Sequence, residues 1–228
     1  MRMTSRLTRR TILSSAAAVG TFALVTRRSK AAEFAYKIGN DVPDSHPMNT
    51  RLQSAIARID EESGGRLVFT LFPNNQLGGD TDMLSQLRSG ALECFNLSGL
   101  ILATMVPVTS IYGIAFAFKD YKTAFEAVDG DLGKYLRSAI DKAGIHSLDR
   151  LWNNGYRQVL TGARPINAPE DLRNKKIRVP VSPLWLSFFK ALGAAPAGIN
   201  WNETYSALQT KTVDGLDTSL LNADISKM

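Results

Sequence analysis

Cysteine and histidine are nearly absent from this chain of 228 residues, which has one cysteine, Cys94, and two histidines, His46 and His146. A single cysteine cannot form an internal disulfide. These three residues lie far apart in the sequence and have no metal-ligand spacing, and neither histidine has a convincing nucleophile partner in the sequence. Cys94 lies in an apolar stretch and is predicted to be a core residue. The chain therefore lacks the usual residues of metal centres and nucleophile–base enzymes.

Phosphate-binding and nucleophile motifs are also missing from the sequence. Neither Gly-x-Gly-x-x-Gly nor Gly-x-x-x-x-Gly-Lys-Ser/Thr occurs, and no Gly-x-Ser-x-Gly elbow is present. The carboxylate pairs Asp80/Asp82 and Glu61/Glu62 stand where helix starts and solvated helix faces explain them. We therefore predict that the chain is not an enzyme and uses no cofactor and no metal.

Acidic residues are missing from the first 31 residues, which contain seven basic side chains. The whole chain has a formal net charge of +6, from 27 basic and 21 acidic residues. Without residues 1–31, 20 basic residues remain against 21 acidic ones, so the body of the chain is close to neutral. A neutral body lacks the broad positive field that binds phosphate backbones, so we predict no nucleic-acid partner.

Residues 1–31 have the three parts of an export signal: a basic start, an apolar stretch over residues 12–25, and small residues at a cleavage site. The pair Arg9-Arg10 resembles a twin-arginine signal, and the cut is predicted after about Ala31. The apolar stretch is shorter than the roughly 20 residues of a membrane span, although an uncleaved anchor is the alternative. No later segment is long and apolar enough to span a bilayer. We therefore predict an exported protein of the Gram-negative periplasm.

Strand and helix patterns alternate after residue 31, which is typical of an α/β fold with parallel sheets. Strands are predicted at 34–39, 66–72, 92–97, 146–152, 157–160, 176–179 and 195–199. Helices are predicted from a cap at Asp44 or Ser45 to residue 63, at 80–89, in short pieces within 100–118, at 121–128, 132–143, 169–172, 183–192 and 202–209, and after residue 213. A polar junction at 153–155 suggests a crossover, so we predict lobe I at 32–153 and lobe II at 154–228.

Two arginines lie at strand positions near this crossover. Arg157 opens a strand directly after the junction, and Arg178 lies between apolar residues of a short strand that ends at Pro180. A buried guanidinium is best satisfied by a carboxylate, which it grips with two parallel hydrogen bonds. The residues alone leave two possibilities open, a carboxylate from a bound ligand or an internal salt bridge.

Several short runs resemble the substrate-binding proteins of TRAP transporters (tripartite ATP-independent periplasmic transporters, DctP type). The runs, in family order, are Phe72-Pro73-Asn74-Asn75-Gln76-Leu77-Gly78-Gly79, Leu87-Arg88-Ser89-Gly90, Asn153-Asn154-Gly155-Tyr156-Arg157-Gln158, Arg164-Pro165-Ile166, Pro169-Glu170-Asp171-Leu172, Lys176-Ile177-Arg178-Val179-Pro180, Leu192-Gly193-Ala194-Ala195-Pro196, Glu203-Thr204-Tyr205-Ser206-Ala207-Leu208-Gln209 and Val213-Asp214-Gly215. Each run is short, but the runs occur in the family's order, and the resemblance spans residues 33–217. The resemblance implies two α/β lobes, as in type II periplasmic binding proteins, joined by hinge-crossing strands.

The resemblance also implies which residues bind the ligand. Arg178 matches the family's defining arginine, which pairs with the substrate carboxylate, and Arg157 matches a second arginine that often assists. Trp201 falls where the family places an aromatic side chain on the ligand, with lobe packing as the alternative. Asp217 and Thr218 stand where the family commonly has Glu-Asn, and the short Thr218 hydroxyl predicts a wider or water-filled site. Asp41 and Ser98 match ligand-facing positions in the first lobe.

The implied function is the capture of a small organic acid anion and its delivery to TRAP-type integral membrane permease subunits, by a monomer in the periplasm. Sialic-acid binders carry an acid where Ser98 stands, which argues against that ligand. An ABC-type or sensory periplasmic binding protein is the alternative, followed by an exported enzyme. Family members continue well beyond the Asp-Gly segment, so we expect an incomplete second lobe and an incomplete return to the first lobe, in a fragment or a truncated gene product.

Overall fold

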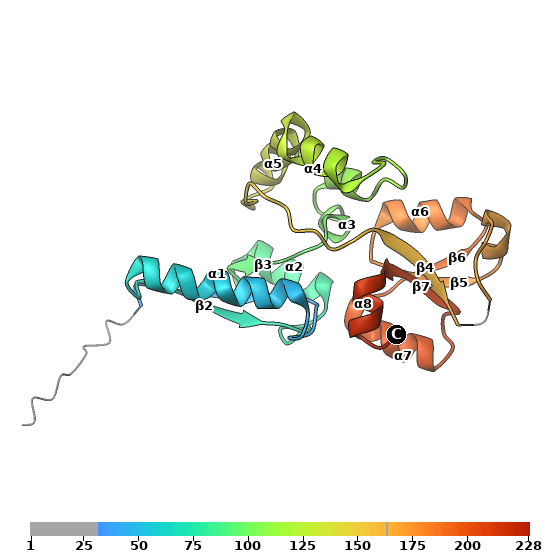
Figure 1. Cartoon of the computed structure of the whole chain (residues 1–228), viewed down its shortest axis with the longest axis horizontal. Coiled ribbons are helices and arrows are strands. Elements are labelled where there is room, and N and C mark those ends of the chain that lie inside the picture. Colours follow the sequence, from blue (N-terminus) through green and yellow to red (C-terminus); the bar gives the residue numbers. More distant parts are fainter. Residues whose placement is uncertain (1–31, 163) are drawn as a thin grey trace, which may run out of the picture. The chain divides into compact units, whose positions relative to one another are not determined.

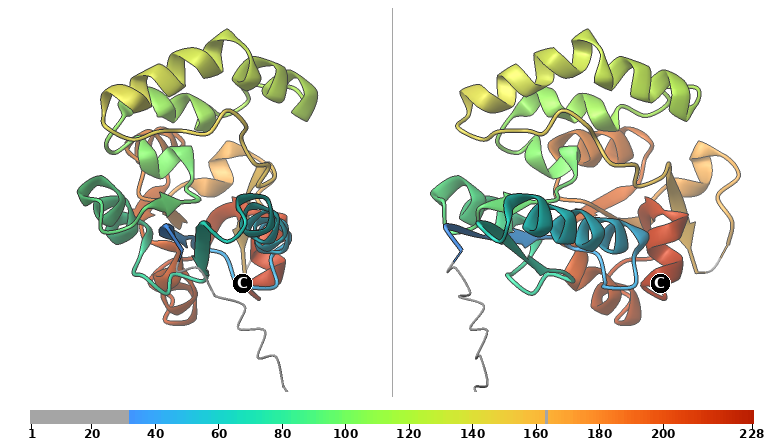
Figure 2. Two further views of the ribbon diagram at one scale, coloured as in Figure 1. Left: turned by 90° about the vertical axis from the view of Figure 1, so that its left-hand side faces the viewer. Right: turned by 60° about the vertical axis from the view of Figure 1, so that its left-hand side comes forward.

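The computed structural model describes residues 32–162 and 164–228 (Figure 1). The predicted export signal and its cleavage site lie outside the described residues. The first sheet has the strand order β2-β1-β3. Its strands β1 (Phe34–Gly39), β2 (Leu67–Phe72) and β3 (Cys94–Phe95) are all parallel, as the alternating pattern predicted. Helix α1 (Pro47–Ser63) lies along this sheet (Figure 2) and contacts β2, and α2 (Asp80–Ser89) precedes β3.

Helix α1 begins at a histidine cap rather than at the predicted Asp44 or Ser45. The Nδ1 atom of His46 accepts a hydrogen bond from the backbone N–H of Met48 at 3.2 Å. Because Nδ1 accepts, the ring proton is on Nε2, which lies 3.0 Å from Oδ1 of Asn222 and donates to it. Burial lowers the pKa of His46 and favours this neutral form. The helix ends as predicted at Gly64, which has the left-handed φ of 63°.

Short helices follow the first sheet, as predicted for residues 100–118, 121–128 and 132–143. They are α3 (Gly99–Leu102), the 3-10 helix η1 (Pro107–Gly113), α4 (Tyr121–Asp129) and α5 (Asp131–Lys142). The strand predicted at 146–152 is wrong, because this segment is irregular. Leu148 and Trp152 are 76% and 42% exposed, so the apolar residues that suggested a strand pack against no neighbouring strand.

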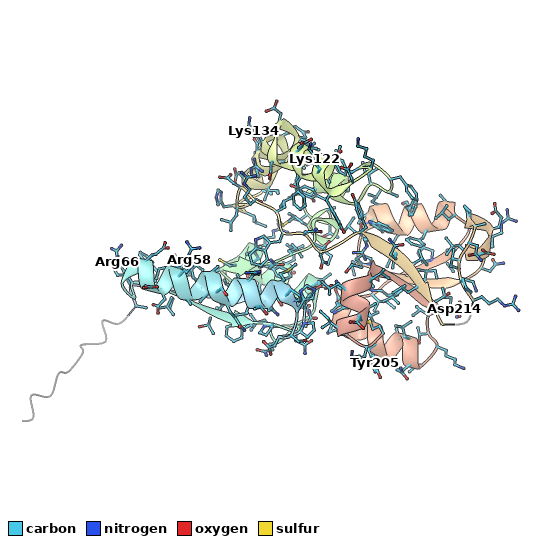
Figure 3. All side chains as sticks on the ribbon, in the orientation of Figure 1. Arg58, Arg66, Lys122, Lys134, Tyr205 and Asp214 are labelled. Atoms are coloured by element: carbon cyan, nitrogen blue, oxygen red, sulfur yellow. The ribbon has the colours of Figure 1, made fainter. Side chains whose placement is uncertain are left out.

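The second sheet has the order β4-β7-β5-β6. Strand β4 (Arg157–Thr161) is antiparallel to β7 (Gly215–Ser219), whereas β5 (Lys176–Val179) is parallel to both β7 and β6 (Ala195–Gly198). Strand β7 lies in the interior of the sheet, and all five of its residues are buried. The sequence predicted a helical segment here, which is wrong for β7 and right only for α8 (Leu220–Ile225). Asp214, labelled in Figure 3, accepts the N–H of Lys176 at 2.8 Å and ties the start of β7 to β5.

The core of the second sheet lies between β5 and helix α6 (Pro183–Ala191), near the 3-10 helix η2 (Pro169–Leu172). Its buried residues are Leu100, Leu172, Ile177, Val179, Trp185, Phe189 and Ala194. Leu100 belongs to α3, so a segment far upstream of residue 154 packs into this core. The lobe boundary at residue 153 stays a prediction.

Strand β7 requires a glycine at its first residue. A Cβ at Gly215 would lie 2.3 Å from the carbonyl oxygen of Leu160 on β4. We expect Gly215→Ala to lower the free energy of unfolding by about 1–3 kcal/mol, because the two strands must separate to admit the methyl group. Urea denaturation measures this change.

Gly162→Ala is the matched control for this prediction. In the described part of the chain, no heavy atom lies within 4 Å of the Cβ position at Gly162. We expect a change within about 0.5 kcal/mol, as for other exposed substitutions. Equal stabilities of the two variants would contradict the close approach of β4 and β7.

Candidate functional site

The predicted site residues lie at the carboxyl ends of parallel strands in both sheets. Asp41 follows β1, and Ser98 follows β3, whose end is paired with the end of β1 through Gly39 and Phe95. In the second sheet, Arg178 lies in β5 and Trp201 begins α7 (Trp201–Gln209), directly after β6. Arg157 is the first residue of β4. Because β4 is antiparallel to β7, the backbone of Arg157 lies opposite that of Ser219, at the carboxyl end of β7. Carboxyl ends of parallel strands are the usual ligand-binding edge of α/β sheets.

Arg178 is buried, with an exposure of 2%. Its Nε donates to the carbonyl oxygen of Ile199 at 2.9 Å, and its Cζ lies 5.3 Å from the ring centroid of Trp201. This distance is within the range of a cation–π contact. Among the described residues, no carboxylate oxygen lies within 4.0 Å of its guanidinium nitrogens. The side chain is thus held in place by a carbonyl and an aromatic ring, without a direct ion pair.

Arg157 has a permanent acidic partner. Its Nε lies 2.5 Å from Oδ2 of Asp217, and its Nη2 donates to the backbone oxygen of Asp217 at 2.8 Å. Asp217 is 1% exposed, and the Cζ of Arg157 also lies 5.4 Å from the ring centroid of Trp185. The internal salt bridge that the sequence left open for either arginine is therefore found for Arg157. Thr218, the next residue on β7, is also buried.

Five ionisable residues form one electrostatic group, the charge cluster of Asp41, Asp80, Asp217, Arg157 and Arg178. Burial, followed by Arg157, lowers the pKa of Arg178 to about 10, and Asp80, Asp217 and Asp41 oppose this change. Burial, followed by Asp80, raises the pKa of Asp41 to about 7. Burial also raises the pKa of Asp80 and of Asp217. Arg178 remains charged at neutral pH, whereas Asp41 titrates near it.

Asp80 is a member of the charge cluster that the sequence interpretation missed. It is 1% exposed, and its Oδ2 accepts the backbone N–H of Trp201 at 3.2 Å, across 121 positions of the chain. The neighbouring Thr81 contacts Asn200, whose Nδ2 lies 3.0 Å from its Oγ1. The sequence pattern explains Asp80 only as an ordinary helix start. The one sequence feature that points to this contact is Gly79, the residue directly before Asp80. A Cβ at position 79 would lie 3.1 Å from Nδ2 of Asn200, so a glycine allows the two segments to approach closely.

Ser98 has a visible structural role. Its Oγ accepts the backbone N–H of Leu100 at 3.3 Å and caps helix α3. Asp41 is half-buried and belongs to the charge cluster. Contact of either residue with a ligand stays a prediction, as it does for the other site residues.

Two hollows of the described residues are lined by no member of the charge cluster. One, of about 520 Å³, is lined by Asp129, Lys134, Arg137, Ser138, Asp141, Asp149 and Arg150. The other, of about 310 Å³, is lined by His46, Pro47, Met48, Arg51, Trp152, Asn153 and Leu221. Within residues 32–162 and 164–228, no three His, Cys, Asp or Glu side chains are placed to hold a metal ion. No helix in these ranges has both the length and the apolar character needed to cross a bilayer.

Comparison with protein families matches residues 38–228 to the model of bacterial extracellular solute-binding protein, family 7 (DctP). The chain is 26% identical over 190 residues to the C4-dicarboxylate-binding protein DctB of Bacillus subtilis, covering 83% of this chain and 54% of that protein. It is 32% identical over 156 residues to the 2,3-diketo-L-gulonate-binding periplasmic protein YiaO of Escherichia coli, covering 68% of this chain and 47% of that protein. The chain thus spans about half the length of these relatives.

Solved structures of TRAP periplasmic solute-binding proteins are similar to this fold. The protein from Sulfurospirillum deleyianum, with bound succinate, has a TM-score of 0.81 and 30% identity, covering 86% of this chain and 63% of that one. The protein from a Sulfitobacter species, with bound β-D-galacturonate, has a TM-score of 0.78 and 26% identity, covering 81% and 61%. The predicted α/β fold of two-lobed binding proteins is confirmed by these similarities.

Proposed function

Because this chain belongs to family 7 of the bacterial extracellular solute-binding proteins, we propose that it captures a small organic acid anion through Arg178. The family and the fold are those of transport proteins that bind solutes, not of enzymes. The proposed site comprises the charge cluster together with Trp201, Thr218 and Ser98. Its ligand is held without chemical change.

One observation carries this proposal: Arg178 is buried and charged, yet has no carboxylate oxygen within 4.0 Å in the described residues. A buried guanidinium without an ion pair is unfavourable. A ligand carboxylate would supply the missing partner with charge-assisted hydrogen bonds. Removal of water around this pair strengthens the attraction, because the local dielectric constant falls. We infer that the two lobes close on the anion for this reason.

Delivery to membrane subunits completes the proposed function. We infer that a TRAP-type permease accepts the ligand from this protein in the periplasm, driven by an ion gradient. The export signal predicted at residues 1–31 and the family membership support this location. We further propose that the protein acts as a monomer and needs no cofactor.

Thermal unfolding of the purified chain in the presence of organic acids tests the proposal. We expect at least one carboxylic acid at millimolar concentration to raise the melting temperature by several degrees, because a ligand that binds only the folded state stabilises it. Neutral sugars and primary amines of similar size are the controls and should cause no shift. A protein whose melting temperature responds to no organic acid would refute the proposed function.

A further inference from the structure

The proposed site contains two arginines, but only one of them is free of a direct ion pair within the described residues. Arg157 is already neutralised by Asp217, with a separation of 2.5 Å between Nε and Oδ2. Arg178 is the other guanidinium of the charge cluster, and within the described residues it makes no ion pair. Arg178 can therefore pair directly with one ligand carboxylate. A second carboxylate on the same ligand would need another cation.

Apart from Arg157, the ionisable groups that act on Arg178 are all acids: Asp80, Asp217 and Asp41. Asp80 is buried at the start of α2, and its Oδ2 accepts the N–H of Trp201, whose ring contacts Arg178. Asp41 follows β1 and interacts electrostatically with Asp80, Arg178 and Arg157. Three carboxylates against two guanidiniums leave a surplus of negative charge when all are ionised. Burial and Asp80 raise the pKa of Asp41 to about 7. Ionisation of Asp41, which adds a further negative charge to the cluster, is therefore already unfavourable.

Hydroxyl groups on a ligand suit these acids well. An ionised carboxylate only accepts hydrogen bonds, and a ligand hydroxyl can donate one to it. A second ligand carboxylate offers no donor and adds repulsion in a site of low dielectric constant. Ser98 and Thr218 add further hydroxyls to the proposed site. We propose that the site around Arg178 selects a monocarboxylic acid that carries hydroxyl groups and discriminates against dicarboxylic acids. This inference rests on the proposed function.

Two matched pairs of acids test this selectivity by titration calorimetry at pH 8. D-erythronate and meso-tartrate form one pair, and galactonate and galactarate the other. Within each pair the terminal CH₂OH of the first acid is a carboxylate in the second. At least one of the two monocarboxylates is expected to bind. Its Kd should be at least tenfold lower than the Kd of the matched dicarboxylate. Butyrate and hexanoate, which lack hydroxyls, should bind at least tenfold more weakly than the hydroxylated monocarboxylates.

Removal of one negative charge should reduce this selectivity. We expect Asp80→Asn, and separately Asp41→Asn, to lower the ratio of dicarboxylate Kd to monocarboxylate Kd at least fivefold. Asp44→Asn is the control, because Asp44 is an exposed acid three positions from Asp41, and it should leave the ratio unchanged. Two variants are used so that a folding defect in one leaves the other as the test.

The pH dependence gives a further readout in the unmodified chain. Asp41, which is affected by Asp80 of α2, Arg178 of β5 and Arg157 of β4, gains negative charge as the pH rises through about 7. The Kd of the dicarboxylate should therefore increase more than that of the monocarboxylate between pH 6 and pH 8. A dicarboxylate that binds as tightly as its partner, or a ratio that neither variant changes, would overturn the selectivity while leaving the proposed function intact. The absence of binding by every acid would instead refute both.

Discussion

Arg178→Ala is expected to weaken binding of the tightest acid of the panel by roughly 30-fold to several thousand-fold. The range corresponds to about 2–5 kcal/mol, the usual loss when one partner of a buried charge pair is truncated. Arg178→Lys should also weaken binding strongly, because an ammonium group lacks the planar fork that grips a carboxylate at two points. Titration calorimetry measures both changes.

Lys176→Ala is the matched control for the loss of a positive charge on β5. Lys176 is an exposed residue of the same strand, two positions from Arg178. Its removal should change the Kd less than threefold. Circular dichroism and cooperative thermal unfolding of the free Arg178 variants show whether they remain folded. Unchanged affinity in a folded Arg178→Ala protein would remove the basis of the proposed function.

Asp217→Ala is expected to lower the free energy of unfolding by about 3–5 kcal/mol, because it leaves the guanidinium of Arg157 without its acid inside the second sheet. The side chain of Arg157 is 21% exposed and that of Asp217 is 2% exposed. Partial exposure of the arginine places the expected loss toward the lower end of this range. Urea denaturation followed by tryptophan fluorescence measures it.

The double variant Arg157→Met/Asp217→Leu distinguishes two causes of lost stability: the loss of the ion pair itself, and the burial of Arg157 without an acidic partner. Replacement of both partners by apolar residues should recover most of the stability, since a buried pair itself contributes little net energy. Glu62→Ala is the surface control. It breaks the pair between Glu62 and Arg58, whose side chains are 69% and 76% exposed (Arg58 is labelled in Figure 3), and should change stability by less than about 1 kcal/mol. An Asp217→Ala loss as small as that of the control would contradict the buried pair.

Strands bounded by clear stop signals were predictable from the sequence. Strand β5 is followed by Pro180, which cannot continue the hydrogen-bond ladder, and the predicted bounds of this strand match the structure. Helix α2 ends as predicted where Gly90 adopts a φ of 77°. Such local signals do not depend on distant parts of the chain. They suffice for elements whose ends are fixed by one residue.

Strand β7 could not be predicted in this way. Only one of its residues, Leu216, is a large apolar side chain, and Asp217, Thr218 and Ser219 are typical of loops and helix caps. These polar residues are buried because β7 lies between β4 and β5, and Asp217 neutralises Arg157 there. The same reason explains the missed Asp80, whose partner Trp201 is 121 positions away. Buried polar residues with distant partners leave no periodic pattern in the sequence.

The position of β7 also determines the order in which the second sheet can form. Strands β4 and β5 both pair with β7, although β7 is the last of the described strands in the chain. During synthesis, β5 can pair with β6, but β4 has no partner in its sheet until residues 215–219 have emerged from the ribosome. Long-range pairing of this kind folds slowly and leaves strand edges open to association in the interim. A nascent chain interrupted before Gly215 therefore presents two unpaired strand edges, which a chaperone would need to shield.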